Sequence, residues 1–586
     1  MADEQSLPER PKDAPAAAAP PTEGAAAAAE GEDKGPSKSA LKKLAKEKEK
    51  AEKAAKRAAE EAARKKESEA NDVSAENYGE LPMIRESTGV EHRRLEDLRE
   101  KYDGKDFGGE GGEGVAGIGP EVVFRAAVEN ARNQSAKLSF LVFAQGHSTI
   151  QAVVAASDTL SRQMVKFAGS IPTESEVIVH GRLGKPREPV KSTTIQNLEV
   201  HVNKLYILCK ADAQLPLQVA DAEGRIPAEG EENAVREDGK PIVSLHARLT
   251  NRTIDLKANL NHAIFKVKYG VQKLFTEFLD ERGFLLMNSP RLLGAASEGG
   301  ANVFEVKYFN SKAYLAQSPQ LYKQMMIAAR FERVMEIGPI FRAENSNTAR
   351  HLTEFTGLDL EMAFEEHYHE VVTLIENLML HIFEGLRTRY AKETELVRSV
   401  YQVEEFKLPQ SGKVPRLHFK EGIQMLRDAG EEVADFDDLS TPQEKKLGAL
   451  VLEKYGSDFY VLDQYPLAIR PFYTMPSKES QANYDPKDPN AGYSNSYDFF
   501  MRGQEIMSGA QRIHNATYLE KRMREHVTPV DPQSDGLRDY VNAFRYGCPP
   551  HAGGGIGLER IVMLYLGLPN IRLASLYPRD PSRLIP

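Results

Sequence analysis

The chain has 586 residues, too many for one compact core, so we expect two or three domains. Hydrophobic residues make up 41% of it and charged residues 28%, a composition typical of a soluble globular protein, and no apolar run is long enough to span a membrane. The formal net charge of −10 argues against a nucleic-acid-binding protein only when charge is averaged over the chain, whereas binding depends on local patches.

The N-terminus and the cysteines both indicate a cytoplasmic protein. The first residues lack the charged-then-apolar pattern of a secretory signal. The two cysteines, Cys209 and Cys548, are far apart and lie near no Cys-x-x-Cys pair or histidine cluster. We therefore expect free thiols in a reduced compartment, with no disulfide and no zinc site.

The first 70 residues divide into two segments by composition. Residues 1–36 are rich in Ala, Pro, Glu and Gly and carry too few large apolar side chains to offset the entropy of ordering, so we expect disorder. Residues 37–70 are rich in helix formers, and Lys42, Lys46 and Lys50 recur along one face of the predicted helix. On charge pattern alone, a solvated helix of mixed charge is favoured over a basic stripe that follows a phosphate backbone.

Residues 71–117 are predicted to be a linker that ends in a glycine-rich stretch. Segment 118–208 then alternates as strands do, with a helix at about 160–168 between the third and fourth strands. The strands are expected at 122–128, 138–143, 149–155, 176–181 and 194–208. This order is the layout of an OB-fold barrel, which commonly binds single-stranded nucleic acid, although a fold alone does not establish function.

The rest of the chain is predicted to be a hinge followed by a large domain. Residues 209–250 are acidic, contain prolines and lack clear periodicity, which suits a hinge. Residues 251–586 mix helices and strands, beginning with a long amphipathic helix at about 257–282 that places Leu260, Ile264 and Val267 on one side. This block is large enough for an α+β domain built on an antiparallel sheet.

Two stretches of this block are candidates for a functional site: an extended segment and an arginine-bearing hairpin. Residues 283–290 form an extended segment that Pro290 ends. Residues 341–344 (Phe-Arg-Ala-Glu) precede a polar loop and a second strand, and a hairpin here would place Arg342 and Glu344 on one face. An inward arginine suits a phosphate or carboxylate because its planar fork makes paired hydrogen bonds. In isolation, however, Arg-x-Glu is more often a cross-strand salt bridge.

A third stretch, residues 551–560, places several glycines before an apolar helix that carries Arg560. Glycines let a backbone approach a ligand closely, and a helix N-terminus favours an anion. No Gly-Lys-Ser/Thr follows and the stretch opens no βαβ unit, so neither a Walker P-loop nor a dinucleotide fingerprint is indicated.

In this order, the three stretches resemble the motifs of the class II aminoacyl-tRNA synthetases. Segments 297–300, 317–323, 356–361, 508–514 and 577–581 further resemble the aspartyl-tRNA synthetase family of the eukaryotic cytoplasmic type. The resemblance implies an antiparallel-sheet catalytic domain, preceded by an OB-fold anticodon-binding domain and a basic helical extension. It also implies ATP-dependent activation of L-aspartate to aspartyl-adenylate, followed by transfer to the 3′ end of tRNA-Asp.

The resemblance assigns roles in the catalytic domain. Arg342, between the α-phosphate and the substrate carboxylate, and Arg560, at the γ-phosphate end, would be catalytic. Asp498 and Glu505 would hold Mg²⁺, which prefers hard oxygen ligands. The aspartate-binding residues would be Ser297, Glu298, Gln320, Lys323, Arg342, Ser508 and Arg512. The ATP-binding residues would be Arg342, Glu344, Arg350, His351, Leu352, Phe355, Glu505, Gly557, Leu558, Glu559 and Arg560.

It also assigns roles outside the catalytic cavity. Phe140, Gln151 and Glu199 would contact the anticodon, with Phe140 offering a stacking face. Lys42, Lys43 and Lys46 would bind tRNA nonspecifically, which reverses the preference for a merely solvated helix. Pro290 would lie at the subunit contact of a homodimer, and membership of a larger synthetase complex stays open.

Alternatives from the sequence are an asparaginyl-tRNA synthetase, a paralogue that makes asparagine from aspartyl-adenylate, and a noncatalytic tRNA-binding paralogue. The asparagine-charging relative typically has an apolar residue at the position of Lys323, whereas two cations, Lys323 and Arg512, discriminate against a neutral amide. Loss of Arg342, Glu505 or Arg560 would favour a noncatalytic protein, and all three are present.

Overall fold

The computed structural model describes residues 72–83, 86–105, 107, 118–228, 230–231, 233–294, 303–409, 411–483 and 492–585. The chain divides into two compact units, Met1–Ala213 and Gln214–Pro586. Several predictions lie outside the described residues: the head (1–36), the lysine-rich helix (37–70) with Lys42, Lys43 and Lys46, and the pair Ser297 and Glu298.

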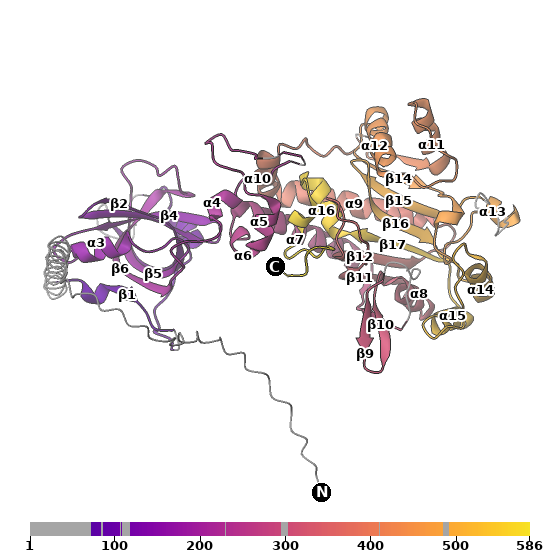
Figure 1. The fold of residues 1–586 in the computed structure, drawn as a ribbon, viewed down its shortest axis with the longest axis horizontal. Coiled ribbons are helices and arrows are strands. Elements are labelled where there is room, and N and C mark those ends of the chain that lie inside the picture. The colour runs from indigo at the N-terminus through magenta and orange to yellow at the C-terminus, as the bar shows by residue number, and fades with distance from the viewer. Residues whose placement is uncertain are drawn as a thin grey trace, which may run out of the picture. The chain divides into compact units, whose positions relative to one another are not determined.

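Five strands of the first unit close into a barrel (Figure 1). They are β2 (Ile118–Ser135), β3 (Leu138–Gln145), β4 (Ser148–Ala155), β5 (Glu176–Gly184) and β6 (Ile195–Cys209). The barrel closes because β6 pairs with both β4 and β5, so the order β6-β4-β3-β2-β5 returns to its start. Helix α3 (Arg162–Ala168) lies between β4 and β5 in the chain. The five predicted strands and the intervening helix are confirmed.

Part of the predicted linker at 71–117 is folded. Strand β1 (Tyr78–Glu80) pairs in parallel with β6, and helix α2 (Leu95–Tyr102) buries Leu95 and Leu98 in the barrel core, where Phe107 joins them. β1 has one apolar residue, Tyr78, and α2 has three, so these elements are too short to show a periodicity in the sequence.

An eight-stranded sheet forms the centre of the second unit. Only the β13–β14 and β11–β7 pairs are parallel, so the predicted antiparallel sheet is confirmed in its central pairs. Its strands, in spatial order, are β13 (Arg416–His418), β14 (Phe459–Asp463), β15 (Ser496–Met501), β16 (Gln504–Gln511), β17 (His551–Gly557), β12 (Glu354–Ala363), β11 (Arg333–Phe341) and β7 (Leu285–Leu286). A separate small sheet has the order β8 (Leu292–Leu293), β10 (Ser311–Leu315), β9 (Glu305–Tyr308).

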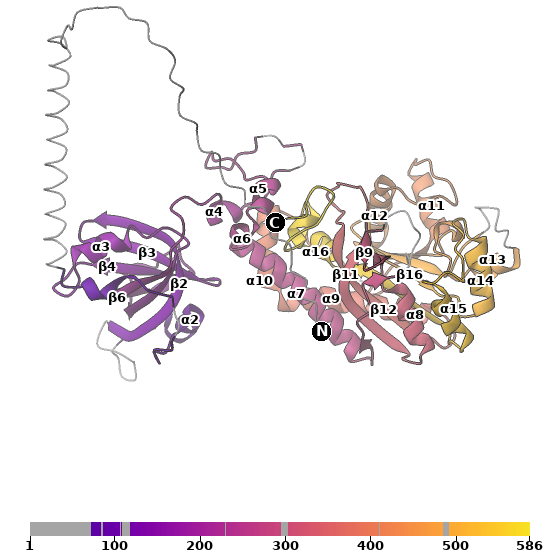
Figure 2. The same cartoon turned by 60° about the horizontal axis from the view of Figure 1, so that its bottom comes forward.

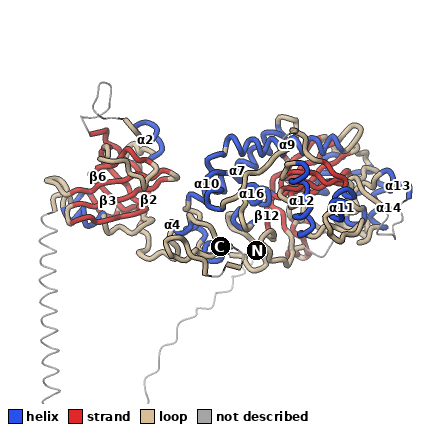
Figure 3. The backbone as a smooth tube through the Cα atoms, turned by 90° about the horizontal axis from the view of Figure 1, so that it is seen from above, coloured by secondary structure: helices blue, strands red, loops and turns tan. Residues whose placement is uncertain are grey.

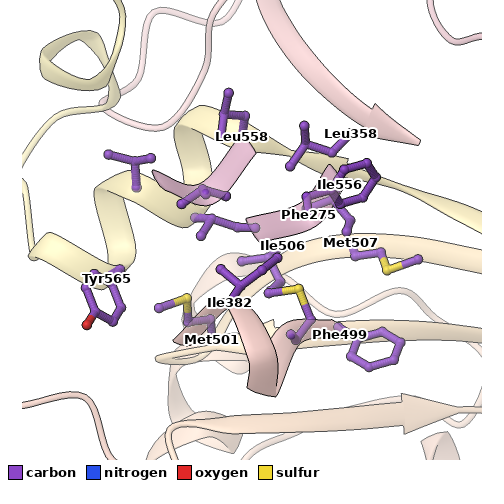
Figure 4. Close-up of a cluster of buried hydrophobic side chains, with 14 of the residues drawn as sticks. Phe275, Leu358, Ile382, Phe499, Met501, Ile506, Met507, Ile556, Leu558 and Tyr565 are labelled. Atoms are coloured by element: carbon purple, nitrogen blue, oxygen red, sulfur yellow. The ribbon is translucent and has the colours of Figure 1, made fainter. Parts of the chain in front are cut away.

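One group of helices covers one face of this large sheet. Helices α7 (Asn259–Asp280), α9 (His369–Arg389), α10 (Ala391–Tyr401) and α16 (Leu558–Leu566) pack together beside the strands (Figure 3). In the core that they share with the sheet, Phe275 and Ile382 from the helices lie near Leu358, Phe499 and Ile556 from the strands (Figure 4). The predicted amphipathic helix at 257–282 is confirmed as α7.

Alternation along β12 decides where a polar site can form. Leu358, Leu360 and Met362 join the core that the helices cover, so Asp359 and Glu361 point to the opposite face. On that side, α8 (Gln320–Ala328) packs on β11 and β12 and lies beside α15 (Arg538–Arg545) (Figure 2). The other helices that follow α7 in the chain are α11 (Phe419–Asp428), α12 (Thr441–Tyr455), α13 (Lys478–Asn483) and α14 (Ala516–Glu525), with 3₁₀ turns η2 (Leu467–Ile469) and η3 (Ile571–Ala574).

Much of the predicted hinge at 209–250 is folded into the second unit. It contains α4 (Val219–Ala222) and α5 (Leu245–Thr250), which precede α6 (Arg252–Asp255). The buried Asp255 carboxylate accepts hydrogen bonds from Arg248 and Arg252, at 2.5 Å each. Arg252 also donates to the carbonyl oxygen of Leu576, so this segment is tied to the C-terminal part of the same unit. Among the described residues, no helix is both long and apolar enough to cross a membrane.

Candidate active site

A cavity of about 470 Å³ opens on the polar face of the large sheet. Its walls come from segments far apart in the sequence: the β11–β12 hairpin, β16, the β17–α16 junction, the start of α12 and the loop after η2. Of the predicted residues, these line the cavity: Gln320, Arg342, Glu344, Arg350, His351, Leu352, Phe355, Glu505, Ser508, Arg512, Gly557, Glu559 and Arg560.

The predicted hairpin is confirmed, but strand alternation does not position its polar residues. β11 ends at Phe341, so Arg342 and Glu344 lie in the loop just beyond it. The Arg342 backbone still donates to the carbonyl oxygen of Thr353, which extends the pairing by one residue. The Arg342 side chain is exposed to the cavity, and its guanidinium lies 5.6 Å from the centre of the Phe355 ring.

Glycines in β17 allow the strands around the cavity floor to approach closely. A Cβ on Gly553 would lie 2.2 Å from the carbonyl oxygen of Leu360 and 2.3 Å from a Glu361 carboxylate oxygen. A Cβ on Gly555 would lie 3.0 Å from Asp359. The glycine-rich stretch therefore makes room for two carboxylates of the neighbouring strand β12.

Those two carboxylates pair with two buried cations. Arg512 Nε donates to Glu361 Oε1 at 2.9 Å, and its Nη2 donates to Gln320 Oε1 at 3.1 Å and to the Gly553 carbonyl oxygen at 2.9 Å. Burial disfavours charge on Glu361, but Arg512 and Lys323 outweigh it and lower the pKa of that carboxyl. The Nη1 group of Arg512 donates to no acceptor in the described part of the chain.

Lys323 lies behind the cavity wall and is absent from its lining, which differs from the direct contact expected. Its ammonium is 2.9 Å from Asp359 Oδ1, 3.2 Å from the Gly554 carbonyl oxygen and 3.5 Å from that of Leu360. These contacts occupy its three donors. The side chain is only 1% exposed, so its positive charge lies behind the cavity wall, paired with Asp359.

Asp498 and Glu505 come from the neighbouring strands β15 and β16. A β-bulge shifts the pairing between Phe499 and Phe500, so that Asp498 pairs with Ser508 while Phe500 pairs with Glu505. The bulge brings Glu505 and Ser508, three residues apart, to the same face. Burial and then the negative charge of Asp498 raise the pKa of Glu505. Asp498 itself is buried behind the lining, bonded to Arg470 at 2.6 Å.

Basic residues gather at the other end of the cavity. Arg560 Nη1 donates to the Glu505 carbonyl oxygen at 2.9 Å, and Arg350 lies 3.5 Å from the Glu444 carboxylate. His351 Nδ1 lies 2.7 Å from the Thr348 hydroxyl, and burial lowers the pKa of His351. Such a cluster of arginines suits the phosphates of a nucleotide.

Two residues of the predicted nucleotide site serve the fold. Leu558, the first residue of α16, is fully buried in the core and does not line the cavity. Glu559 lines the cavity, but its carboxylate accepts hydrogen bonds from the Thr356 backbone at 2.9 Å and from Lys268 at 2.7 Å. It therefore ties α16 to β12 and α7.

The sequence did not single out Arg470, Asp438 or Glu444, which also line the cavity. Arg470 carried a usable signal: it stands in an aromatic and proline-rich stretch, where a charged residue is buried only when it is paired. Asp438 and Glu444 carried none, because they come from an ordinary polar segment around the start of α12.

The structure brings the three predicted anticodon-contacting residues of the barrel to one outer face. Phe140, Gln151 and Glu199 belong to the adjacent strands β3, β4 and β6, and all three alternate with buried residues. Gln151 pairs with Glu199 and donates to its carboxylate at 3.2 Å. His201 lies 3.3 Å from the same carboxylate, and its hydrogen bond lowers the pKa of Glu199.

Pro290 is exposed next to the edge of the large sheet. The edge strand β7 carries Leu285 and Leu286, which are 47% and 49% exposed, and Leu292 nearby in the chain is 50% exposed. An open strand edge with apolar side chains is a common site of association.

Comparisons with known proteins agree with this geometry. A family model described as tRNA synthetases class II (D, K and N) matches residues 244–581. The cytoplasmic aspartate–tRNA ligase of Homo sapiens is 51% identical over 467 residues, covering 80% of this chain and 89% of the relative. That of Rattus norvegicus is 48% identical over 521 residues, covering 88% and 96%. The solved structure of the aspartyl tRNA synthetase from Entamoeba histolytica gives a TM-score of 0.73 at 41% identity, covering 87% of this chain and 96% of that one.

Proposed function

Because the chain belongs to the class II tRNA synthetases (D, K and N), we propose a division of roles among its cavity residues in the reaction of this family. The chain is an aspartate–tRNA ligase, whose substrates are ATP, L-aspartate and tRNA-Asp. The observation that carries the roles is the cavity itself, whose lining includes Arg512, fixed by Glu361, together with the arginines Arg342, Arg350 and Arg560.

Selectivity for aspartate rests on Arg512. Glu361, Gln320 and the Gly553 carbonyl oxygen hold its guanidinium in place, and Nη1 is left to donate to the substrate side chain. A carboxylate accepts such bonds with full charge, whereas the amide of asparagine would present its NH₂ group to a donor. Lys323, behind the wall, adds a second positive charge that favours a carboxylate. Gln320 and Ser508 complete the aspartate contacts, and Ser297 and Glu298, outside the described residues, are proposed to bind aspartate as well.

Activation joins the two halves of the cavity at Arg342. The aspartate α-carboxylate attacks the α-phosphorus of ATP, which gives aspartyl-adenylate and pyrophosphate. Arg342 would bind both the carboxylate and the α-phosphate, since its planar fork makes paired bonds, and would stabilise the charge that builds up between them. No side-chain nucleophile is required for this step.

The nucleotide occupies the arginine-rich end. Phe355 offers a ring face for adenine, with Arg342 already 5.6 Å from the ring centre on the free enzyme. Arg560 and Arg350, with His351 nearby, suit the outer phosphates. Glu344, Leu352 and Gly557 complete the walls around the nucleotide.

Asp498 and Glu505 fit a Mg²⁺ ion that accompanies ATP. Among the described residues, the buried Asp498 Oδ1 has no hydrogen-bond partner, and burial and then the negative charge of Asp498 raise the pKa of Glu505. A cation shared with phosphate oxygens would relieve both features, and carboxylate oxygens are ligands that Mg²⁺ prefers. When bound, Mg²⁺ would neutralise part of the phosphate charge.

Transfer to tRNA completes the reaction. The 3′-terminal ribose hydroxyl attacks the activated carbonyl and releases AMP. The barrel face of Phe140, Gln151 and Glu199 would contact the anticodon, with Phe140 stacking on a base. The segment with Lys42, Lys43 and Lys46 would add sequence-independent affinity for the tRNA backbone.

We further propose a homodimer in the cytoplasm. The exposed apolar edge around Leu285, Leu286 and Pro290 supports the dimer contact, because pairing two such edges would bury their leucines. The relatives carry the word cytoplasmic in their names, which supports the location.

The function is tested by ATP–pyrophosphate exchange with L-aspartate, L-asparagine and L-lysine offered separately to the purified chain. We expect exchange with aspartate alone, followed by charging of tRNA-Asp. Exchange with asparagine but not aspartate would overturn the proposed role of Arg512.

A further inference from the structure

Arg470 is a largely buried arginine in the cavity wall, and none of the roles above involves it. It follows η2, and its side chain is 11% exposed. Its Nη2 donates to Asp498 Oδ2 at 2.6 Å, and its Nη1 donates to the Ser508 hydroxyl oxygen at 2.9 Å. One guanidinium therefore connects a carboxylate on β15 with a hydroxyl on β16.

The strand pairing explains how one side chain reaches both groups. Asp498 and Ser508 are directly opposite each other across the β15–β16 ladder. Directly opposite residues project from the same face at about 4.5 to 5.5 Å between their Cβ atoms. The planar fork of an arginine can span two such acceptors, whereas a lysine ammonium is a point charge on a flexible stem.

The plane of this fork is itself fixed. The guanidinium lies 3.9 Å from the centre of the buried Tyr465 ring, and His526 Nε2 lies 3.0 Å from the Arg470 carbonyl oxygen. Arg470 Nε and Asp498 Oδ1 are nonetheless buried without hydrogen-bond partners among the described residues. An ion pair that served stability alone would be expected to satisfy these atoms, so the arrangement points to a role in function.

The direction of the Ser508 bond has a chemical consequence. Because the Ser508 oxygen accepts a hydrogen bond from Arg470, its own proton is left to donate in another direction. No other hydrogen bond of this hydroxyl is formed within the described part of the chain. Ser508 lines the cavity, and a donor there suits an acceptor such as a substrate carboxylate oxygen.

We propose that Arg470 is a positioning residue that fixes the Ser508 hydroxyl as a hydrogen-bond donor to aspartate, with Asp498 holding the guanidinium in register. The proposal rests on the proposed function, in which Ser508 contacts aspartate. In this proposal Arg470 acts on aspartate through Ser508.

A double-mutant cycle on aspartate affinity tests this route. The dissociation constant of L-aspartate is measured by titration calorimetry, without ATP or divalent cations, for the parent chain, Arg470→Lys, Ser508→Ala and the double variant. We expect each single change to weaken binding about 5- to 20-fold. The dissociation constant of the double variant should lie within about twofold of that of the single variant that binds aspartate more weakly, because both changes remove the same hydrogen bond.

Arg416→Lys is a matched control for replacing a guanidinium that bonds two acceptors with an ammonium. Arg416 donates to the Glu376 carboxylate at 2.7 Å and to the Thr373 hydroxyl at 2.7 Å, but it lies outside the cavity lining. It should leave aspartate affinity unchanged. Thermal unfolding of all variants separates a loss of fold from a loss of positioning, and Arg470→Lys keeps the positive charge that Asp498 needs.

Two results would overturn the proposal. One is a double variant whose loss is the product of the two single losses, which would mean that Arg470 and Ser508 act independently. The other is a Ser508→Ala variant with normal affinity beside a weakened Arg470→Lys variant. Failure of the proposed function is distinguishable from both, because the parent chain itself would then bind no aspartate.

Discussion

Arg512, just beyond the end of β16, and Glu361 on β12 are bonded past the intervening strand β17 before any substrate is present, with 2.9 Å between Nε and Oε1. Glu361 is fully buried, so the carboxylate cannot turn to water, and the pair fixes the arginine plane. Charge in this pocket is therefore balanced, with two cations facing two carboxylates, and its preference for aspartate depends on which donors remain available.

The first prediction concerns Arg512→Lys. Lysine keeps the charge but lacks the fork that bonds Glu361 and the substrate together. We expect kcat/KM for aspartate in pyrophosphate exchange to fall about 100-fold, with discrimination against asparagine reduced. Arg389→Lys, whose parent arginine bonds Glu277 at 2.7 Å between helices, should retain full exchange. Equal losses in the two variants would contradict a specific role.

Arg342→Ala should remove catalysis without removing the fold. The side chain is exposed, and its one close contact within the described structure is the Phe355 ring. We expect the rate of adenylate formation to fall by about 10²- to 10³-fold, as for other groups that stabilise developing charge, and the melting temperature to change little. Single-turnover measurement gives the rate, and Arg538→Ala on α15 serves as the control. A raised KM with an unchanged rate of adenylate formation would contradict the catalytic role.

The sequence predicts some residues of this site but not how all of them are arranged. Arg342, Arg560 and Arg512 were found through local motifs, because the chemistry fixes their residue types and their neighbours. Glu505 and Ser508 share a face only because of the β-bulge in β16, and simple alternation would have placed them on opposite faces.

Other contacts and elements are not predictable from the sequence because they depend on tertiary packing. The pairing of Arg470 with Asp498 joins segments separated by a loop, and no local pattern encodes such a contact. The sequence around α2 does not predict a helix, because its apolar face has only Leu95 and Leu98, and tertiary packing on the barrel stabilises it. Lys323 was identified as a cation of the pocket, but its burial depends on carboxylates that the sequence alone does not place around it.

Glu444 should make stability depend on pH near neutrality. Burial, and then the negative charge of Glu505, raise the pKa of Glu444 to about 7. The folded chain thus holds this proton more tightly than the unfolded chain, so stability is greatest below the unfolded pKa and falls as pH rises toward 7. Glu444→Gln removes the cost of ionising this buried carboxyl. The free energy of unfolding of the variant, relative to the parent chain, should therefore be about 2 kcal/mol more favourable at pH 8 than at pH 5.

Urea unfolding of both proteins at the two pH values measures this difference. If the variant is instead less stable at pH 8, the 3.5 Å contact of Glu444 with Arg350 outweighs the cost of burying its charge. Asp438→Asn offers a comparison, because burial also raises the pKa of Asp438 at the same end of the cavity.

Phe140 should affect tRNA without affecting activation. Loss of a stacking face costs about 1 to 3 kcal/mol per base, so Phe140→Ala should raise the KM for tRNA about 10- to 100-fold. Pyrophosphate exchange, which needs no tRNA, should be unchanged, because Phe140 lies in the first unit and the cavity in the second. Phe140→Tyr keeps the ring and should restore tRNA binding. Equal weakening by both variants would exclude stacking as the reason.

Removal of residues 1–71 tests the lysine-rich segment, and the structure sets where the cut must fall. A cut at 118 would also remove β1 and α2, which pair with β6 and fill the barrel core, and would confuse loss of a binding segment with damage to the barrel. A chain that begins at Asp72 keeps the hydrogen bond of Ser74 to Ser161 at the start of α3. We expect this chain to activate aspartate normally but to bind tRNA more weakly, with a shallower dependence of affinity on salt, because fewer phosphate counterions are released. Affinity measured from about 50 to 200 mM salt gives the slope, and an unchanged slope would show that Lys42, Lys43 and Lys46 do not contact the tRNA backbone.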